Sequence, residues 1–398
     1  MRKRLGITTL LVILASLCAP SLVCRETRQL EWSADLSAYG YSAKHPYSDT
    51  VVAASNENVG VALNVSQDNN PTPDVPAAFP RSNWKLSFLV FDATNGKFRT
   101  TCGPWFGSDL FNLWPTSDGD FLLYQQARQI DQEETSGRLL LLSPSCQVME
   151  KMELPALGKN GGAEFLMSPT RRTFLITEYS GRIAQSEVRD AKTLVERFKI
   201  APASDEPQIV AASDDGLLGI KSEQSASSTT TATRLFYLDF HTQKWREVPG
   251  PMASYASNSV RFVSDDAFVD AATTGRTDAW AASGVRIIVR RMDGTAVFST
   301  VMSRKAASIS LGSPLAVSPT GKYFGVVLSS YSVASFWRFL DMSPGHDQGY
   351  IWSIRSAKPI ARISAQRAFL CQQLSFAPDD SWFAFCDGKM LMVSRLPG

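Results

Sequence analysis

Apolar residues in this chain gather in short runs that polar turns interrupt, a pattern typical of β-strands joined in hairpins. The stretch 314–330 shows this well, because the apolar arms 315–317 and 323–328 flank Ser-Pro-Thr-Gly at 318–321. Ser-Pro-Thr-Gly is a preferred sequence for a type I turn, because the fixed φ of Pro suits the second position and Gly is favoured at the fourth. A second strand pair is predicted over 350–363, and the four strands together predict one small antiparallel sheet.

Strand pairs of this kind recur along the chain. They begin near Val51, Phe111, Glu164, Gln208, Ser259, Pro314 and Gln373, at intervals of 60, 53, 44, 51, 55 and 59 residues. A second pair follows each of the first six, over 86–101, 138–154, 185–200, 234–248, 285–300 and 349–364. No helical periodicity of any length competes with the pattern. A four-stranded repeat near fifty residues is typical of the blades of a β-propeller.

The seventh unit lacks its last strand, because the chain ends shortly after the apolar segment 389–395. The N-terminal segment 28–36 can supply that strand, since Leu30, Trp32, Ala34 and Leu36 alternate with polar residues. Closing the ring in this way leaves no long unpaired sheet edge. The sequence therefore predicts an all-β fold: a seven-bladed β-propeller of four-stranded antiparallel blades, closed by an N-terminal strand.

The segments SPTGKYFGVVLSS and SFAPDDSWFAFCDG resemble the WD40-like repeats of bacterial secreted and periplasmic β-propellers, including the TolB-type repeat. The resemblance covers residues 28–398 and implies the fold. No blade has the Gly-His start or the Trp-Asp end of the eukaryotic WD40 pattern. The resemblance therefore implies no intracellular scaffold role.

The first residues have the layout of a secretory signal peptide, with a basic start at 2–4, an apolar run at 5–17 and small residues at 19 and 21. An uncleaved anchor is the alternative, although the apolar run is short for a membrane span. Cleavage near 19–21 or after Cys24 is compatible with the sequence. We expect a signal peptide over 1–24, one propeller domain over 25–398, no membrane span after signal removal, and a secreted or periplasmic location.

Charge and chemistry exclude several classes of function. The chain has 40 Lys+Arg and 38 Asp+Glu; without Arg2, Lys3 and Arg4 the mature balance is 37 − 38 = −1, which leaves no electrostatic footprint for nucleic acid. Three histidines, His45, His241 and His346, are too few and too scattered for a His-rich metal site. No Gly-x-Ser-x-Gly elbow is present. No metal, no cofactor and no catalytic residue is predicted.

Three acidic pairs occupy the same turn in three of the repeats. They are Asp214-Asp215, Asp265-Asp266 and Asp379-Asp380. Carboxylate pairs can carry acid–base catalysis, but Asp is also a preferred turn residue. The shared position favours a turn-forming role.

The long segments all fall between the second and third strands of a blade. They are 67–85, 125–137, 222–233, 271–284 and 329–348. Insertions gathered on one face of a repeat fold usually mark its binding side, and aromatic residues and Arg are enriched in binding hot spots. On this basis, together with one connection between blades, the predicted binding residues are Phe79, Arg81, Trp84, Trp105, Arg276, Trp280, Tyr331, Trp337, Arg338 and His346. The alternative is that these rings only pin loops to the rim.

The cysteines pose a separate question. Cys371 and Cys386 flank the turn of the last strand pair, and an exported chain permits a disulfide between them. Two buried thiols are the alternative, because cross-strand disulfide geometry is demanding. Cys102 and Cys146 are a further possible pair, although the predicted strands place them at different ends of their blades.

Two functions are compatible with the sequence. The first is a non-enzymatic module, expected to be a monomer, that binds a protein, peptide or glycan on the loop-bearing face. The second is a hydrolase or lyase with its site at the mouth of the central channel. A convergent set of acids, bases or metal ligands at the ends of the inner strands would favour the second.

Overall fold

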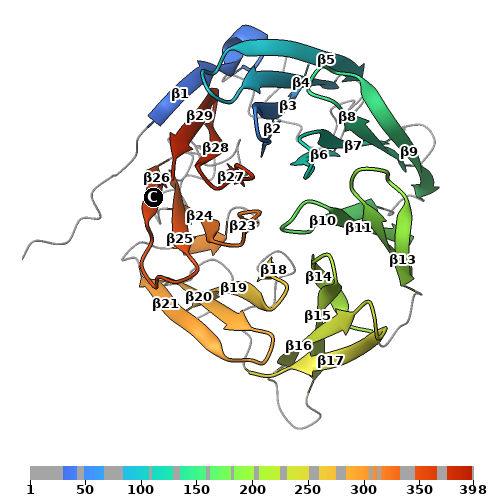
Figure 1. Cartoon of the computed structure of the whole chain (residues 1–398), viewed down its shortest axis with the longest axis vertical. Helices are drawn as coiled ribbons and strands as arrows, with labels where there is room; N and C mark the ends of the chain where they lie inside the picture. The colour runs from blue at the N-terminus through green and yellow to red at the C-terminus, as the bar shows by residue number, and fades with distance from the viewer. Residues whose placement is uncertain are drawn as a thin grey trace, which may run out of the picture.

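In the computed structural model, the repeats fold into seven antiparallel sheets that stand as blades around a central axis (Figure 1). The structure describes residues 30–42, 49–66, 84–106, 110–128, 135–157, 162–180, 183–200, 206–224, 231–250, 260–274, 284–303, 308–311, 315–331, 346–364 and 374–396. Apart from one short 3-10 segment, every regular element in those ranges is a strand. The predicted all-β, seven-bladed propeller is confirmed.

Each blade begins at the centre of the ring and adds strands outward. The first strands are β2 (Asp49–Ala54), β6 (Leu110–Pro115), β10 (Gly162–Met167), β14 (Gln208–Ala212), β18 (Val260–Ser264), β22 (Ser308–Leu311) with β23 (Ala316–Val317), and β27 (Leu374–Phe376). The second strands are β3 (Asn58–Ser66), β7 (Phe121–Arg128), β11 (Thr173–Ser180), β15 (Gly216–Gln224), β19 (Ala267–Thr274), β24 (Tyr323–Tyr331) and β28 (Trp382–Asp387).

The outer half of each blade repeats the same order. The third strands are β4 (Trp84–Asp92), β8 (Thr135–Leu142), β12 (Ile183–Asp190), β16 (Thr231–Asp239), β20 (Gly284–Arg291), β25 (His346–Ser353) and β29 (Met390–Arg395). The outermost strands are β5 (Phe98–Phe106), β9 (Val148–Leu157), β13 (Glu196–Ile200), β17 (Lys244–Val248), β21 (Ala296–Ser303), β26 (Ala361–Ser364) and, in the closing blade, β1 (Leu30–Asp35).

This strand order gives the ring two different faces. Because neighbouring strands are antiparallel, the turns between first and second strands share one face with the turns between third and outer strands. We call it the turn face. The opposite face, the loop face, receives the links between second and third strands and the links from blade to blade. The strands that flank the predicted long segments end on the loop face, while most of each segment, over 67–83, 129–134, 225–230, 275–283 and 332–345, lies outside the described residues.

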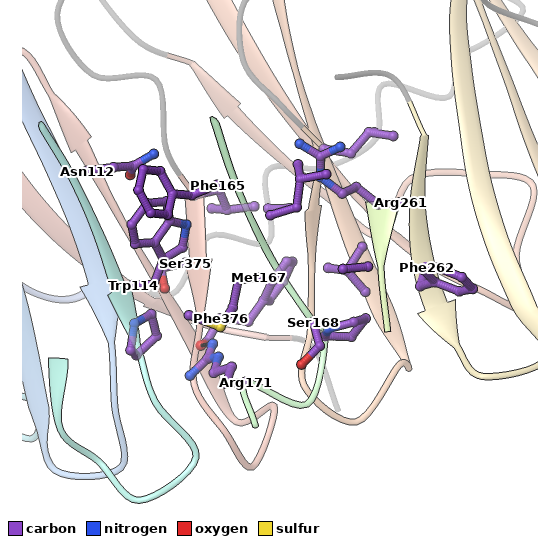
Figure 2. Close-up of a pocket in the computed structure, with 18 of the residues that line it drawn as sticks. Asn112, Trp114, Phe165, Met167, Ser168, Arg171, Arg261, Phe262, Ser375 and Phe376 are labelled. Carbon is purple, nitrogen blue, oxygen red and sulfur yellow. Dashed lines mark hydrogen bonds between the residues drawn. The ribbon is translucent and has the colours of Figure 1, made fainter. Parts of the chain in front are cut away.

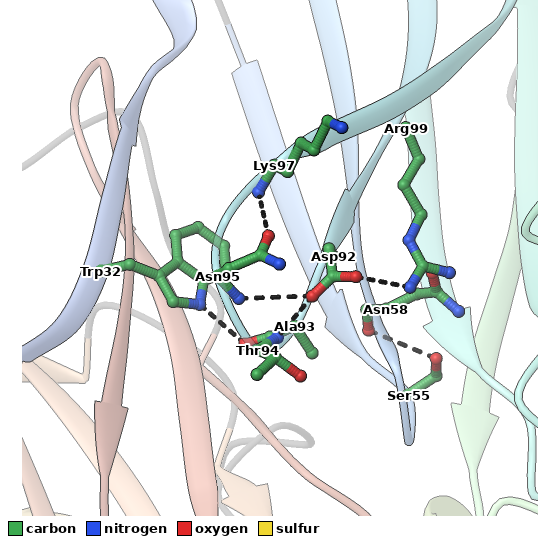
Figure 3. A network of polar contacts seen from close by, with 9 residues as sticks. All are labelled: Trp32, Ser55, Asn58, Asp92, Ala93, Thr94, Asn95, Lys97 and Arg99. Atoms are coloured by element: carbon green, nitrogen blue, oxygen red, sulfur yellow. Dashed lines mark hydrogen bonds and ion pairs between the residues drawn. The ribbon is translucent and has the colours of Figure 1, made fainter.

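The N-terminal strand closes the ring, as predicted. β1 pairs with β29, and the short 3-10 helix η1 (Leu36–Tyr39) follows it. Trp32 is buried against the first blade, and its indole Nε1 donates a hydrogen bond of 2.7 Å to the carbonyl of Ala93 (Figure 3). The expected inward alternation fails at one position: Leu30 is exposed, because the register shifts between Leu30 and Trp32.

Apolar clusters between neighbouring blades form the core. In the cluster between the first two blades, the rings of Phe88 and Phe121 lie 5.1 Å apart. A disulfide between Cys102 and Cys146 crosses the same joint, with Cα atoms 5.3 Å apart. The expectation that these two cysteines lie at different ends of their blades was wrong. Cys102 lies within β5, and Cys146 sits in the β8–β9 turn in a left-handed conformation with φ 70° that brings it to the neighbouring strand.

Hydrogen bonds between hydroxyl groups and carboxylates join neighbouring blades on the turn face. Thr170 Oγ1 donates to Asp214 in the next blade at 2.6 Å. The arrangement recurs between the last two blades, where Ser318 and Thr320 both donate to Asp380. All three acidic pairs lie in turns between first and second strands, as predicted, and Asp214 and Asp380 also link one blade to the next.

Candidate functional site

The central channel holds a cavity of about 200 Å³, shown in Figure 2. Every blade contributes lining residues, and they come from the first strands β2, β6, β10, β14, β18, β23 and β27 or from the turns that follow them. Apolar residues are the majority, but the side chains of Asn112, Ser168 and Ser375 make part of the lining polar. The charged lining residues are Arg171 and Arg261.

Arg171 lies at the turn-face end of the channel. It lies in the β10–β11 turn with φ 63°, and its guanidinium reaches across the axis. One Nη donates to the carbonyl of Ala54 at 2.7 Å, and the other donates to the carbonyl of Phe376 at 2.5 Å. Its own carbonyl accepts from the amide of Ser117 at 3.2 Å. A single residue thus ties four of the seven blades together at this end.

The charge of Arg171 is held in a buried environment. Burial lowers the pKa of its guanidinium to about 9, and the nearby Asp380 carboxylate opposes that shift. Burial likewise raises the pKa of Asp380, although hydrogen bonds from Thr320 and Ser318 favour its ionised form. The guanidinium remains protonated at neutral pH, and Asp380 is the acid whose charge stabilises it.

Arg261 lies toward the loop-face end of the same channel. It is the second residue of β18, and Figure 2 shows it across the cavity from Asn112 and well separated from Arg171. Its Nη1 donates to the carbonyl of Val210 at 3.0 Å and to that of Val260 at 2.8 Å. Within the described part of the chain, Nε and Nη2 have no hydrogen-bond partner, and Arg261 forms no ion pair.

The wall opposite Arg261 is aromatic. The rings of Trp114 on β6 and Phe165 on β10 lie 5.5 Å apart. Tyr124 of β7 packs behind them, with its ring centroid 4.2 Å from that of Phe165. The amide side chain of Asn112 lies above these rings, toward the loop face (Figure 2). This half of the channel therefore offers aromatic faces together with polar groups.

One carboxylate lies near Arg261. Glu164 on β10 accepts a hydrogen bond of 2.9 Å from the hydroxyl of Tyr179. Burial lowers the pKa of Arg261 to about 10, and the charge of Glu164 opposes that shift. Burial and the same carboxylate raise the pKa of the Tyr179 hydroxyl. The tyrosine thus stays neutral and holds Glu164 in place.

The predicted binding residues lie mostly beyond the described structure. Phe79, Arg81, Arg276, Trp280, Trp337 and Arg338 fall outside the described residues. Trp84, Tyr331 and His346 are not in loops: they are end residues of β4, β24 and β25, where the sheets meet the loop face. Their place in the chain is consistent with a position on that face, and nothing further tests them.

Trp105 occupies a different place from the one predicted. The sequence assigned it to a connection between blades, but it belongs to β5, the outermost strand of the first blade, opposite Leu86. Its ring is half-buried against the apolar cluster between the first two blades and lies over Gly103. A packing role at the rim accounts for these contacts, and Trp105 does not reach the channel.

Of the predicted disulfide, only one half is described. Cys386 is buried on β28 opposite Leu391, while Cys371 lies outside the described residues. The pairing stays a prediction. Across the ranges that the structure describes, no group of three or more His, Cys, Asp or Glu side chains is placed to hold a metal ion. In the same ranges no helix has the length and apolar character needed to cross a membrane.

The residues that line the channel were not predicted from the sequence, although the sequence contained an indication of them. Polar residues stand within predicted inner strands at Asn112, Glu164 and Arg261, where a packed propeller needs apolar ones. That mismatch could have indicated a lined channel. Arg171 had no such signal, because a basic residue in a hairpin turn normally faces water.

Comparisons with known proteins add little to this description. No family model matches the chain, and no curated protein matches it. The chain is similar to a solved structure titled "Structure of Dos1 propeller", with 15% sequence identity and a TM-score of 0.44. The match covers 94% of this chain and 96% of that one. A likeness at this level says nothing about ligand or activity, so the order of the strands carries the assignment of the fold.

Proposed function

We propose that this chain is a non-enzymatic binding module of the cell envelope or exterior. It recognises a protein, a peptide or a glycan through the loop face of the propeller. The blades resemble those of secreted and periplasmic WD40-like propellers with TolB-type repeats, and the mature protein is the single domain that follows a signal peptide over 1–24. We expect it to act as a monomer.

The observation that carries this proposal is the difference between the two ends of the channel. At the turn face, the Arg171 guanidinium joins the carbonyls of Ala54 and Phe376 across the axis. We infer that a ligand reaches the lining residues from the loop face. The strands that flank the long segments end on that same face, and insertions gathered on one face of a repeat fold usually mark its binding side.

The Cys102–Cys146 disulfide supports an extracytoplasmic location. Disulfides persist in oxidising compartments and are rare in reducing ones. The basic and apolar start of the chain independently favours export. These two observations come from different parts of the molecule and favour the same compartment.

A hydrolase or lyase is the second candidate, and one observation favours it. Glu164, Tyr179 and Arg261 approach one another near the loop-face entrance, where a propeller enzyme would hold its site. However, the Glu164 carboxylate is engaged by the Tyr179 hydroxyl, whose pKa is raised. The Tyr179 hydroxyl therefore stays protonated and occupies one oxygen of the carboxylate, so we favour binding over catalysis.

The test is capture from the native envelope fraction by the mature protein, with variants that separate the two faces. The double change Trp280→Ala, Trp337→Ala removes two predicted loop-face rings. It should weaken capture of the partner sharply, because truncating a hot-spot residue costs about 2 kcal/mol or more of binding free energy. The melting temperature should change little, since surface changes cost about half a kcal/mol at most.

The matched control is Lys322→Ala, an exposed side chain in a turn-face turn. It should change neither capture nor melting temperature. Equal losses of capture from both faces would contradict a loop-face site. A melting temperature lowered by many degrees in the double variant would show instead that the two rings belong to the core.

A further inference from the structure

We propose that the channel binds the carboxylate of an apolar acid, and that Arg261 is the residue that holds it. This inference rests on the proposed binding function and names the chemistry of one contact inside the channel. A free small acid and the C-terminal end of a peptide share this chemistry. The loop-face entrance admits the group, and the Arg171 guanidinium marks the far end of the channel.

The hydrogen bonding of Arg261 points to an anion. Nη1 is fully used by the carbonyls of Val210 and Val260, which fixes the guanidinium plane. Nε and Nη2 are the free edge, and within the described residues no protein group accepts from either of them. A planar pair of N–H donors matches the two oxygens of a carboxylate, which favours a bidentate contact.

The size of the cavity limits what can enter. A volume of about 200 Å³ lies below the roughly 300–1,000 Å³ of pockets that enclose drug-sized ligands. It suits one small acid, one side chain or one chain end rather than a drug-sized molecule. A ligand therefore inserts a single group into the channel, and the rest of it remains on the loop face.

The lining indicates which kind of group fits. Opposite Arg261, the rings of Trp114 and Phe165 present aromatic surface, with Met167 below them. Transfer of apolar surface from water to this wall contributes roughly 25 cal/mol per Å² buried. A group with a carboxylate at one end and an aromatic or aliphatic body next to it satisfies both sides of the channel.

Nearby charge favours a single carboxylate over a more highly charged anion. Glu164 lies close enough to stabilise the charged form of Arg261, but it forms no ion pair with it. A phosphate with two negative charges would meet the repulsion of this carboxylate, whereas a carboxylate with one charge meets less of it. The predicted ligand is therefore a monoanion.

The experiment measures binding of 3-phenylpropanoate and of its amide, 3-phenylpropanamide, to the mature protein by isothermal titration calorimetry. The two probes have the same shape and differ in charge. We expect saturable binding of the acid and at least tenfold weaker binding of the amide. Equal binding of the two, or no saturable binding of the acid, would overturn the proposal.

A second pair of probes distinguishes the possible sources of the carboxylate. N-acetyl-Gly-Phe carries a free C-terminus, and N-acetyl-Gly-Phe-amide does not. Tighter binding of the free peptide than of 3-phenylpropanoate would identify a peptide end as the source, and the reverse order would identify a small acid. Both orders support a carboxylate site, whereas equal binding of the free and amidated peptides would count against it.

Variants place the ligand in the channel. Arg261→Gln should weaken binding of the acid at least tenfold, and Arg261→Lys should fall between it and the wild type because it keeps the charge and loses the planar edge. Arg246→Gln is the control, since Arg246 lies over the Tyr237 ring on the outer part of its blade, 4.9 Å from the ring centroid. Unchanged affinity in Arg261→Gln would refute the assignment. If that variant fails to fold, the comparison of acid and amide on the wild type still decides.

A fluorescence measurement gives an independent location. The acid should change the tryptophan emission of the wild type, and Trp114→Phe should abolish that change while keeping most of the affinity. An unaltered response in Trp114→Phe would place the acid elsewhere. If the acid does not bind but the loop-face variants still lose capture of the partner, only the channel proposal is contradicted. If the acid binds but loop-face and turn-face variants lose capture equally, only the proposed function is contradicted.

Discussion

Two arginines line one channel, and they have opposite relations to the protein around them. Arg171 directs both Nη groups to carbonyls of two other blades and has the Asp380 carboxylate nearby. Arg261 uses one Nη group for two carbonyls and leaves its other edge toward the cavity. Both Nη groups of Arg171 thus have hydrogen-bond acceptors within the protein, whereas Arg261 has acceptors for only one of its Nη groups.

The difference shows that burial alone does not identify a binding residue. A buried charge costs several kcal/mol unless paired and hydrogen-bonded groups offset that cost. At the turn face, hairpin turns from several blades come close enough to provide those groups. Around Arg261, the described residues provide carbonyl partners for Nη1 alone, so the lining keeps a donor edge that a ligand can use.

The largest effect is expected from Arg171→Met. The change leaves the carbonyls of Ala54 and Phe376 without their donor and removes one of the two cations, Lys322 and Arg171, that stabilise the Asp380 carboxylate. Breaking a buried charge interaction in this way costs about 3–5 kcal/mol of unfolding free energy. Denaturant unfolding measures it. Arg172→Met is the matched control, because Arg172 is the exposed neighbour in the same turn and should cost less than about half a kcal/mol. Equal losses of unfolding free energy in the two variants would contradict a stabilising role of the Arg171 guanidinium between blades.

The second largest loss of stability is expected when the strand that closes the ring is weakened or removed. Trp32→Ala removes the indole that packs against the first blade and donates to Ala93. We expect a loss of about 3 kcal/mol, at the low end for a buried tryptophan. Deletion of 25–37 should lower the unfolding temperature of the whole domain. Ser33→Ala, on the exposed side of β1, is the control. Unchanged thermal unfolding of the deletion would rule out closure by β1.

A smaller effect on stability is expected from Arg261→Gln. Gln retains an N–H donor, so the loss should be about 1 kcal/mol, the scale of a single hydrogen bond. The comparison with Arg171→Met is therefore sharp: one arginine contributes mainly to folding, and the other mainly to binding. A destabilisation as large as that of Arg171→Met would show that Arg261 contributes to folding as much as Arg171 does. Denaturant unfolding curves of the two variants under the same conditions measure the difference.

The smallest expected effect is a loss of stability at low pH. The pKa of Asp35 is lowered from 3.8 to about 2, first by its hydrogen bond with Lys389 and then by the amide of Ser37. A depressed carboxyl pKa stabilises the folded state above the unfolded pKa, and that contribution is lost as pH falls through the folded pKa. The closing strand should therefore weaken between about pH 4 and pH 2. Asp35→Asn should reduce the steepness of that loss, and an unchanged acid profile would show that the contact is too exposed to matter.

The repeats made the fold readable from the sequence. The spacing of turn-centred strand pairs and the alternation around Trp32 predicted seven blades and their closure, because period-two patterns and Pro-Gly turns act locally. The strand ends were harder to place. Trp84, Tyr331 and His346 were assigned to loops, yet strand pairing extends to them: Trp84 pairs with Ser66, His346 with Ser330, and Tyr331 with Ser308. Pairing depends on a partner strand, which no local pattern shows.

The sequence by itself determined that the chain builds a ring of similar blades, which turns hold acidic pairs, and which face receives the long segments. Tertiary structure alone decided the channel. Arg171 lies in an ordinary hairpin turn, and only the meeting of several blades at the axis brings its guanidinium to the carbonyls of Ala54 and Phe376. Cys102 and Cys146 likewise become partners only because neighbouring blades stand side by side. Interactions between blades depend on the closed ring, and closure is a property of the whole chain that no single repeat carries.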